Sequence, residues 1–403
     1  MGDDMSVGMN DLKGPVGGIL GSLPEGLLPP AVLQQAQALL AKDWAMKLQD
    51  RSFGTVAANI TVPVYTGGKI NAANNAAKIK VENAAQKETQ ARNGLVSELT
   101  ERYYGLALAM QVVEVRKQVL DGMRHHLSDA VALENNGIIA KGERLYAEVH
   151  TAEAEREYLK AQKTVETLKS ALGSTLNSEE SVAPASDMFI LSDIEGADYF
   201  KQCALDRNPL LRQVSYAKRL ATENMRLQRS EFAPQVALMG IASLYNYQVS
   251  SIMPKWAVGA GVSFKIFDGL HREYKFSAAR WQIRQAEAVG EQAHNNMLTL
   301  IDKLYNEMVT YSQQLPSVDA SYRFATEYLR IKDEAFKEGA APSSDVVDAR
   351  LNLAKIKIER LQAAYYYDLM LARLLEAAGI SEAFSDYAKR SAAMPIRFED
   401  ESN

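Results

Sequence analysis

The sequence predicts an internally duplicated α+β membrane protein in which long helical hairpins alternate with β-strands. An alternating apolar strand ends in Val64-Tyr65-Thr66-Gly67-Gly68, and Ile266-Phe267-Asp268-Gly269-Leu270 repeats this pattern 202 residues later. A helix of about 65 residues, on the order of 100 Å long, is predicted after each glycine, and no compact domain needs such a helix. Each repeat is therefore expected to consist of a strand, a long helix, a tight turn and a return helix.

The two halves of the chain align at this offset without a gap over more than 100 residues. The aligned pairs include Gly67 and Gly269, Tyr103 and Tyr305, Gly137 and Gly339, Ala147 and Ala349, and Glu157 and Glu359. Chance matches would not keep both glycine stops and both strand parities in register, so we interpret the alignment as an internal duplication.

Composition excludes several classes of function. The 403 residues are 47% hydrophobic and 24% charged, which is typical of a folded protein. The net charge of -5, with both signs interspersed, predicts no nucleic-acid partner. The single Cys203 lies in no Cys/His cluster, and His125 and His126 point about 100° apart on a helix that we expect to be solvated there. We therefore expect no metal site, no cofactor and no catalytic residues.

The N-terminal region is predicted to be irregular. Residues 1–10 are at best a remnant strand, and residues 11–52 form an external loop insertion rich in glycine and proline. A short helix is expected over about 31–48, because paired prolines favour the start of a helix. Residues 53–66 alternate between apolar and polar positions and are predicted to be a barrel strand.

The first helical hairpin is predicted over residues 67–173. Its long helix covers 69–135 and ends at Gly137, which is placed to adopt a positive φ. The return helix covers about 143–172 and is expected to end at the glycine that follows. Residues 174–206, with mixed polarity and Pro184, are expected to form a connecting equatorial subdomain.

The second repeat begins with a helix and a β-hairpin. Asn208-Pro209 is expected to open the helix over 207–233, and the hairpin covers 234–268 with a loop at 250–254. The first repeat has no equivalent of this helix and only a remnant of the first hairpin strand. The chain is therefore expected to be truncated at its N-terminus, and the sequence does not say whether such a chain assembles.

The second strand of this hairpin has the alternation of a lipid-facing barrel strand. Small and polar residues face one side, and the other side carries Trp256, Val258, Ala260, Val262, Phe264 and Ile266. Trp256, Tyr245 and Tyr247 are predicted to form an aromatic membrane girdle, with ordinary strand packing as the alternative reading.

The second helical hairpin is predicted over residues 269–379. A buried stripe is expected on its long helix, 270–338, which Pro316 should kink. The return helix starts near Ser343 with the spacing of a coiled-coil seam. The stripe is Ala293, Met297, Leu300, Leu304, Met308, Tyr311 and Leu315, and the seam is Val347, Leu351, Ala354, Ile358, Leu361 and Tyr365. Residues 380–403 are predicted to be a polar C-terminal tail.

This arrangement needs other copies of the chain. Four strands at most cannot close a barrel, and open strand edges do not survive in lipid. The long helices also carry apolar stripes that no globular core is available to bury. A symmetric oligomer with a transmembrane β-barrel at one end and a long α-helical barrel at the other satisfies both needs.

The order of these motifs resembles the TolC family of outer membrane efflux proteins over most of residues 53–379. The shared motifs are an aromatic residue plus Asp/Thr-Gly at the strand ends, Asn208-Pro209, Phe232-Ala233-Pro234, and Gly339 followed by Asp345-Val346. The resemblance implies a homotrimer with a 12-stranded barrel in outer-membrane lipid and an α-barrel extending into the periplasm. It also implies a passive exit duct for efflux or type I secretion, served by a periplasmic adaptor and an inner-membrane pump.

The resemblance places the channel constriction at the helical turns. Asp345 and Asp348 match the acidic residues that line it, and Glu143 holds the equivalent position in the first repeat. The alternative is that Asp345 caps its helix. Phe336 and Ala341 stand where the family pattern has tyrosine and arginine, so the sequence does not say whether the gate uses the family's latch.

The turns themselves, Gly137–Glu143 and Gly339–Asp345, are expected to contact the adaptor, with plain turn chemistry as the alternative. A second function remains open: a coiled-coil periplasmic adaptor or scaffold whose strands form a small sandwich. A sandwich would bury the face of Trp256 and Val258, whereas a barrel would expose it. The sequence names neither the exported substrate nor the pump, and an enzyme has little support.

Overall fold

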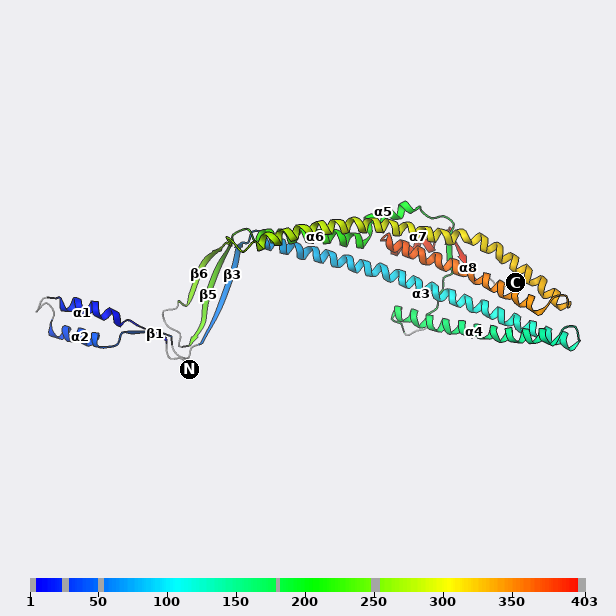
Figure 1. The fold of residues 1–403 in the computed structure, drawn as a ribbon, viewed down its shortest axis with the longest axis horizontal. Coiled ribbons are helices and arrows are strands. Elements are labelled where there is room, and N and C mark those ends of the chain that lie inside the picture. Colours follow the sequence, from blue (N-terminus) through cyan, green and yellow to red (C-terminus); the bar gives the residue numbers. More distant parts are fainter. Residues whose placement is uncertain (1–4, 24–28, 50–53, 179–181, 248–253, 398–403) are drawn as a thin grey trace. The chain divides into compact units, whose positions relative to one another are not determined.

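The computed structural model describes residues 5–23, 29–49, 54–178, 182–247 and 254–397 (Figure 1). It is mostly helical and divides into two compact units. The first unit comprises 1–75 and 223–280, and the second comprises 76–222 and 281–403. Of the described helices, none is both long enough and apolar enough to cross a membrane.

The first unit contains a three-stranded antiparallel sheet. Its strands are β3 (Gly54–Tyr65), β5 (Gln235–Tyr247) and β6 (Trp256–Ser263), in the order β3-β5-β6. The three strands lie where the sequence predicts them, although β6 ends before Phe264. Ser250 to Met253 of the predicted hairpin loop lie outside the described residues.

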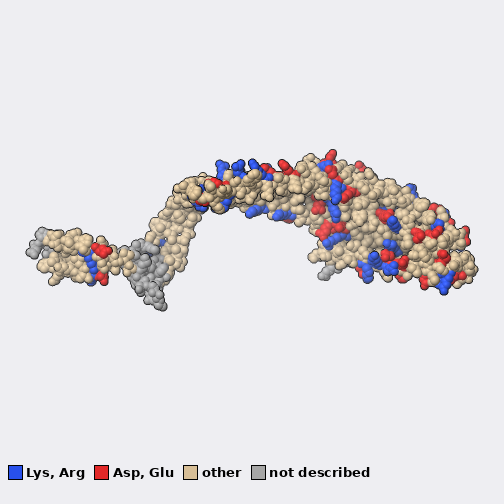
Figure 2. Space-filling view, viewed as in Figure 1, with Lys and Arg blue, Asp and Glu red and all other residues tan. Residues whose placement is uncertain are grey.

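The register of the sheet places the predicted apolar positions of β3 and β6 on one face. Ile60 lies opposite Gly240, which in turn lies opposite Val258, and directly opposed residues share a face. That face is open, since Ile60 is 66% exposed and Val258 is 78% exposed. None of the residues in the three strands is charged, and the visible surface of the sheet in Figure 2 is accordingly almost free of charge.

The N-terminal region is more regular than the sequence predicts. β1 (Met5–Gly8) pairs with β2 (Ala45–Gln49), and η1 (Asn10–Leu12), α1 (Lys13–Gly21) and α2 (Pro30–Ala41) lie between them in the chain. The predicted irregular loop is therefore wrong for 13–21. The helix predicted over 31–48 starts as expected at a proline but ends at Ala41, because the following residues pair as a strand. Residues 1–4, 24–28 and 50–53 of this region lie outside the described part.

Two helices of 67 residues dominate the chain. They are α3 (Lys69–Asn135) and α7 (His271–Lys337), whose bounds match at an offset of 202. α7 continues through Pro316 without interruption. The return helices are α4 (Lys141–Leu176) and α8 (Ser343–Ala377).

The predicted stop of α4 at Gly173 is wrong. This glycine lies inside the helix, which ends at Asn177 with a left-handed φ of 49°. The Ser178 amide donates to the Gly173 carbonyl at 3.0 Å, which closes the last turn. Asn177 follows the end of α4 as Gly379 follows the end of α8, and both residues are left-handed, with a φ of 74° at Gly379. Asparagine tolerates this conformation better than most residues, and the sequence reading considered only glycine.

The core of the second unit is built around α8. β4 (Met188–Leu191) and β7 (Ala393–Ile396) pair as a small antiparallel sheet, and α5 (Ala197–Arg207) follows β4 in the chain. Large side chains in this core are fully buried, among them Phe200, Leu371 and Tyr367. Two residues of the predicted stripe and seam are instead exposed: Leu300 and Leu351 point outward, and Ile301 and Leu353 are buried in their place. A straight α-helix has 3.6 residues per turn, whereas an alternating 4-3 spacing averages 3.5. Positions with that spacing therefore move gradually away from the buried face of the helix.

The predicted polar tail is also wrong for most of its length. After α8 the chain forms η2 (Ser381–Ala383), α9 (Phe384–Ala388) and β7. Arg390 forms an ion pair with Glu195 at 2.8 Å, which anchors this segment to the residues that follow β4. The polar composition misled the prediction because only a few residues of this segment, Ser381, Phe384, Tyr387 and Ile396, are buried. Residues 398–403 of the predicted tail are not among those described.

α6 (Pro209–Ser230) opens as the sequence predicts. The Asn208 side-chain oxygen accepts hydrogen bonds from the amides of Leu210 at 2.8 Å and Leu211 at 3.2 Å, and its amide group donates to the Ala377 carbonyl at 2.7 Å. One asparagine therefore caps α6 and fastens it to the end of α8.

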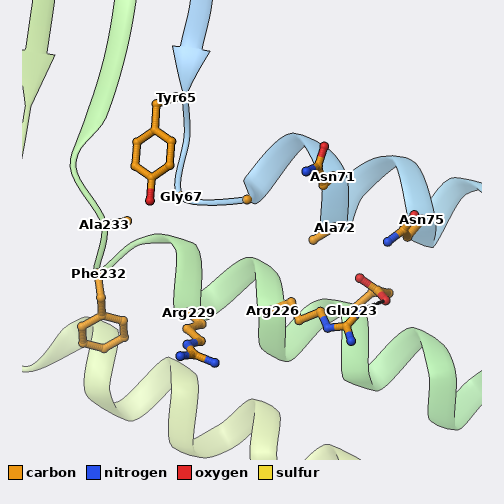
Figure 3. Close-up of a pocket in the computed structure, with 11 residues that line it drawn as sticks. Tyr65, Gly67, Asn71, Ala72, Asn75, Glu223, Arg226, Arg229, Phe232 and Ala233 are labelled. Carbon is orange, nitrogen blue, oxygen red and sulfur yellow. Dashed lines mark hydrogen bonds and ion pairs between the residues drawn. The ribbon is translucent and has the colours of Figure 1, made fainter.

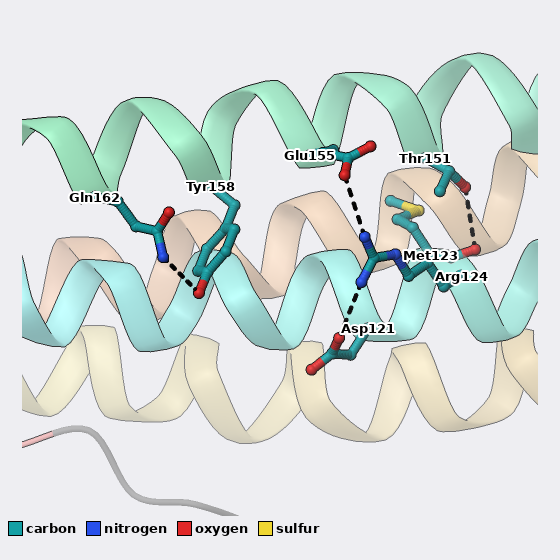
Figure 4. A network of polar contacts seen from close by, with 7 residues as sticks. All are labelled: Asp121, Met123, Arg124, Thr151, Glu155, Tyr158 and Gln162. Atoms are coloured by element: carbon teal, nitrogen blue, oxygen red, sulfur yellow. Dashed lines mark hydrogen bonds and ion pairs between the residues drawn. The ribbon is translucent and has the colours of Figure 1, made fainter.

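The helices of each hairpin are joined by polar contacts as well as by packing. Between α3 and α4, Arg124 binds Glu155 at 3.2 Å, and the Thr151 hydroxyl donates to the Met123 carbonyl (Figure 4). Between α7 and α8, Arg360 binds Asp319 at 2.8 Å.

Candidate functional site

Both helical hairpins turn through glycine as predicted. Gly137 has a φ of 74° and Gly339 a φ of 71°. The amide after each glycine donates back across the helix end: Ile138 donates to Leu133 at 2.9 Å, and Ala340 donates to Ala335 at 2.8 Å. These bonds satisfy carbonyls that the helix leaves free, and a positive φ at the turn makes them possible.

The hairpin turns meet at Ser343, the first residue of α8. Its backbone amide donates to the Glu143 carboxylate at 2.7 Å, and its hydroxyl lies 2.7 Å from Nε2 of His126. These partners come from α4 and α3, so Ser343 joins both helices of the first hairpin to the second hairpin. We call His126, Glu143, Phe336 and Ser343 the tip cluster.

His126 is the residue of this cluster that sequence reasoning missed. Its side chain is buried, at 3% exposure, and its ring lies 4.4 Å from that of Phe336. The prediction of a solvated helix face holds only for His125, whose side chain is 70% exposed. A signal was present, because residue 126 continues the buried spacing of Val119, Met123 and Ala130.

Burial lowers the pKa of His126, and the nearby Arg350 guanidinium lowers it further. Asp333, Asp129 and Glu143 act in the opposite direction but do not reverse the shift. Arg350 is itself paired with Asp333 at 2.9 Å. His126 is therefore neutral at pH 7 and shares a hydrogen bond with Ser343.

Glu143, predicted to line the constriction, is used for this contact. A carboxylate on the first amide of a helix is favoured by the helix dipole and by the free N–H group there. Phe336, where the family pattern has tyrosine, is 1% exposed and packs with Ala130, Ala147 and Val346. It therefore acts as a core residue of the tip.

The other two predicted constriction residues differ from one another. Asp345 binds the Lys332 ammonium at 2.6 Å, and this bond raises the pKa of the lysine. Asp345 makes no capping hydrogen bond, because the N-cap position is Pro342. Asp348 is exposed. Burial raises the pKa of Tyr146 on α4, and the negative charge of Asp348 raises it further. Of the two aspartates, only Asp345 has its charge balanced by a direct ion pair.

Both predicted strand–helix junctions have the left-handed backbone that their glycines allow. Gly67 has a φ of 62° and Gly269 a φ of 71°. The residue after each glycine is also left-handed, and in the second junction it is Leu270, with a φ of 65°. Asp268 binds Arg272 at 3.0 Å, and this guanidinium lies 5.2 Å from the centre of the Phe232 ring.

A cavity of about 550 Å³ lies at the first junction (Figure 3). Asn71 and Asn75 of α3 and Glu223 and Arg226 of α6 line it, with Tyr65 at the end of β3. Glu223 is 7% exposed and is paired with Arg226 at 2.6 Å. Its charge is thus already balanced within the chain.

The three residues of the predicted aromatic girdle lie at one end of the sheet. Tyr245 pairs with Val56, Tyr247 with Gly54, and Trp256 with Ala242, which places all three on the apolar face. They are between 51% and 69% exposed. Across the described residues, no group of three or more His, Cys, Asp or Glu side chains is arranged to hold a metal ion.

Comparison with known proteins agrees with this arrangement. The sequence model of the outer membrane efflux protein family matches residues 201–380. The comparison with proteins of curated function finds no match for this chain. The predicted resemblance to this family of channels is therefore confirmed by the family match and by the fold of solved structures.

Three of those structures illustrate the likeness. The outer membrane protein VceC of Vibrio cholerae is 17% identical, with 92% of each chain covered and a TM-score of 0.69. The CmeC outer membrane channel of Campylobacter jejuni is 15% identical, covers 85% of this chain and 81% of its own, and has a TM-score of 0.68. A membrane protein from Pseudomonas aeruginosa is 15% identical, with 81% of each chain covered and a TM-score of 0.70.

Proposed function

We propose that this chain, whose residues 201–380 match the outer membrane efflux protein family, is one subunit of a trimeric exit duct. The duct crosses the outer membrane as a 12-stranded β-barrel and extends into the periplasm as an α-helical barrel. The two repeats of the chain, related by an internal duplication, contribute equivalent parts of this wall. The observation that carries the proposal is the uncharged, exposed sheet of the first unit.

The sheet has the chemistry of a barrel segment. Its apolar face is open, and its outer strands β3 and β6 each present an edge without a partner among the described residues. Open edges are stable in lipid only when a barrel closes, so further strands must come from other copies. Three copies of this sheet supply nine strands, and the other three strands of a 12-stranded barrel would have to come from the N-terminal region, where β1 pairs with β2 and not with the sheet.

The helical unit needs other copies for a similar reason. On α4, Leu145, Val149 and Leu159 are between 45% and 57% exposed. On α7, Phe324 and Ile331 are 66% and 48% exposed. Each set recurs at helical spacing and forms an uncovered apolar stripe, and packing one stripe against the other between neighbouring subunits would close a ring of helices.

The duct is passive, and its partners supply energy and docking. A periplasmic adaptor is expected to contact the hairpin turns at Gly137 and Gly339, and an inner-membrane pump delivers small molecules or proteins. At the tip, copies of Asp348 from three subunits would form an acidic ring that favours cations.

The alternative is a coiled-coil periplasmic adaptor or scaffold. In that case a second layer would cover the sheet, as in a sandwich. Trp256 and Val262 remain 69% and 70% exposed, and none of the described segments covers their face. This exposure favours the duct.

The experiment that tests the duct is conductance in planar bilayers, with the purified protein in detergent. We expect a trimer by native mass spectrometry and stepwise channel currents. A monomer that stays in solution without detergent and conducts no current would reject the duct and favour the scaffold.

A further inference from the structure

We propose that a cavity beside the small sheet of β4 and β7 binds a small aromatic carboxylate. The cavity has a volume of about 670 Å³ and lies within the second unit. It is lined by residues of α3 and α9, of the two strands and of the segment that precedes β4. Small-molecule sites usually have volumes of about 300–1,000 Å³ and mostly apolar walls. The site lies within one chain, so it does not depend on the proposed duct.

Three buried aromatic rings make the apolar part of this cavity. They belong to Tyr104 of α3, Phe189 of β4 and Phe384 of α9, which are between 4% and 9% exposed. Their ring centres lie 6.0–6.4 Å apart, in tilted and edge-on arrangements. Aromatic rings prefer such contacts with one another, so the three rings offer a flat ring of a ligand the contacts that they make among themselves. The body of the ligand is therefore expected to be aromatic.

Tyr103 holds one wall of the cavity in place. Its hydroxyl oxygen accepts hydrogen bonds from the amides of Ala185 at 2.8 Å and Ser186 at 2.9 Å. These bonds fasten the segment before β4 to α3, and Tyr103 and Ser186 both line the cavity. The O–H of this tyrosine can still donate, because no acceptor for it lies among the residues that the structure describes. An oxygen of the ligand can accept this bond.

The charges that line the cavity favour an anion. They are those of Asp187 and Lys389. Asp187 lies 4.0 Å from Arg397, whose positive charge balances its own. Lys389 follows α9 at an exposed position and forms no ion pair with any described residue. A carboxylate beside Lys389 would gain a charge-assisted hydrogen bond while the aromatic body of the ligand lies against the buried rings.

The test is equilibrium dialysis of 2-naphthoate against the full chain in detergent, with protein-free detergent as the blank. We expect one saturable site per chain. The uncharged analogue 2-naphthalenemethanol should bind about fivefold more weakly, which is the upper end of the effect of an exposed ion pair. Lys389→Gln should weaken the binding of 2-naphthoate by about the same factor and leave that of the alcohol unchanged. Lys160→Gln, at an exposed lysine of α4, is the matched control and should leave both affinities unchanged.

A second variant tests the place of the site. Ser385 lines the cavity at an exposed position, so Ser385→Trp should block the cavity and abolish the binding of both probes. If the tryptophan disturbs the fold, Lys389→Gln still tests the proposal. Absence of saturable binding to the parent chain, equal affinity for the two probes, or an unchanged affinity in Ser385→Trp would overturn it.

Binding is measured without any current. A chain that binds 2-naphthoate as expected but conducts no ions would therefore support this site and reject the proposed duct, and the reverse result would reject the site alone.

Discussion

Gly67 and Ala233 approach so closely that a β-carbon on Gly67 would lie 2.5 Å from that of Ala233. The backbone of Gly67 also has a positive φ, so two independent constraints demand glycine at this position. Gly269, its counterpart in the second repeat, has the same backbone conformation, but among the described residues no atom beyond its chain neighbours lies within 4 Å of such a β-carbon.

Comparing alanine variants of Gly67 and Gly269 separates the energetic cost of backbone strain from the cost of steric overlap. Gly269→Ala should cost about 1–2 kcal/mol, the usual penalty of a left-handed conformation. Gly67→Ala should cost this amount plus about 1–3 kcal/mol of overpacking against Ala233. Thermal unfolding of both variants in the same detergent measures the difference. Equal losses would show that the contact with Ala233 relaxes freely.

The charges at the hairpin tip predict opposite effects on ion selectivity. Asp348→Asn should lower the preference for cations, because an exposed carboxylate is removed from each subunit. Lys332→Gln should raise it, since Asp345 loses the ammonium that balances its charge. Reversal potentials in a salt gradient measure both changes. An unaltered reversal potential in Asp348→Asn would place this residue away from the ion path.

Asp368 predicts a pH-dependent stability. Complete burial raises its pKa well above the ordinary value, and its carboxyl group accepts a hydrogen bond from the Phe189 amide at 3.2 Å. The folded protein therefore holds a proton that the unfolded chain releases above about pH 4. This contribution is fully present below about pH 4 and is lost as the pH rises through the raised pKa.

Asp368→Asn removes this dependence while keeping an oxygen that accepts the bond from Phe189. We expect it to stabilise the protein at pH 8, by about 1.4 kcal/mol for each unit by which the pKa is raised, and to change stability less at pH 5. Denaturant unfolding at the two pH values measures this. Asp386→Asn, at an exposed position, is the matched control and should show no such difference. A loss of stability at pH 8 would mean that the carboxyl group is ionised in the fold.

The apolar stripes on α4 and α7 predict where subunits meet. Val149→Glu or Phe324→Lys should weaken the trimer, because each places a charge in a stripe that assembly would bury. Native mass spectrometry in detergent measures the trimer fraction. Lys160→Glu, on an exposed charged position of α4, should leave it intact. A stable trimer in both stripe variants would move the interface elsewhere.

Local signals in the sequence predicted most of the elements. The bounds of α3 and α7, the strand β3 and the turns at Gly137 and Gly339 follow from periodicity and glycine placement, which depend on neighbours within a few residues. The helix 31–48, the stop at Gly173 and the polar tail after Gly379 were wrong. For the helix and the tail, a contact with a distant segment decided the outcome: strand pairing of β2 with β1, and of β7 with β4. The stop at Gly173 was wrong for a local reason, because Asn177 adopts the left-handed conformation that ends α4.

The candidate site divides in the same way. The sequence by itself determined that the hairpins turn through glycine and that acidic residues follow the turns, because turn geometry and helix starts are local. Only the tertiary structure decided that Glu143 binds the amide of Ser343, that Asp345 is paired with Lys332 and that His126 is buried beside them. These partners lie between 13 and 217 residues apart in the chain, and packing of the helices alone brings them within hydrogen-bonding distance.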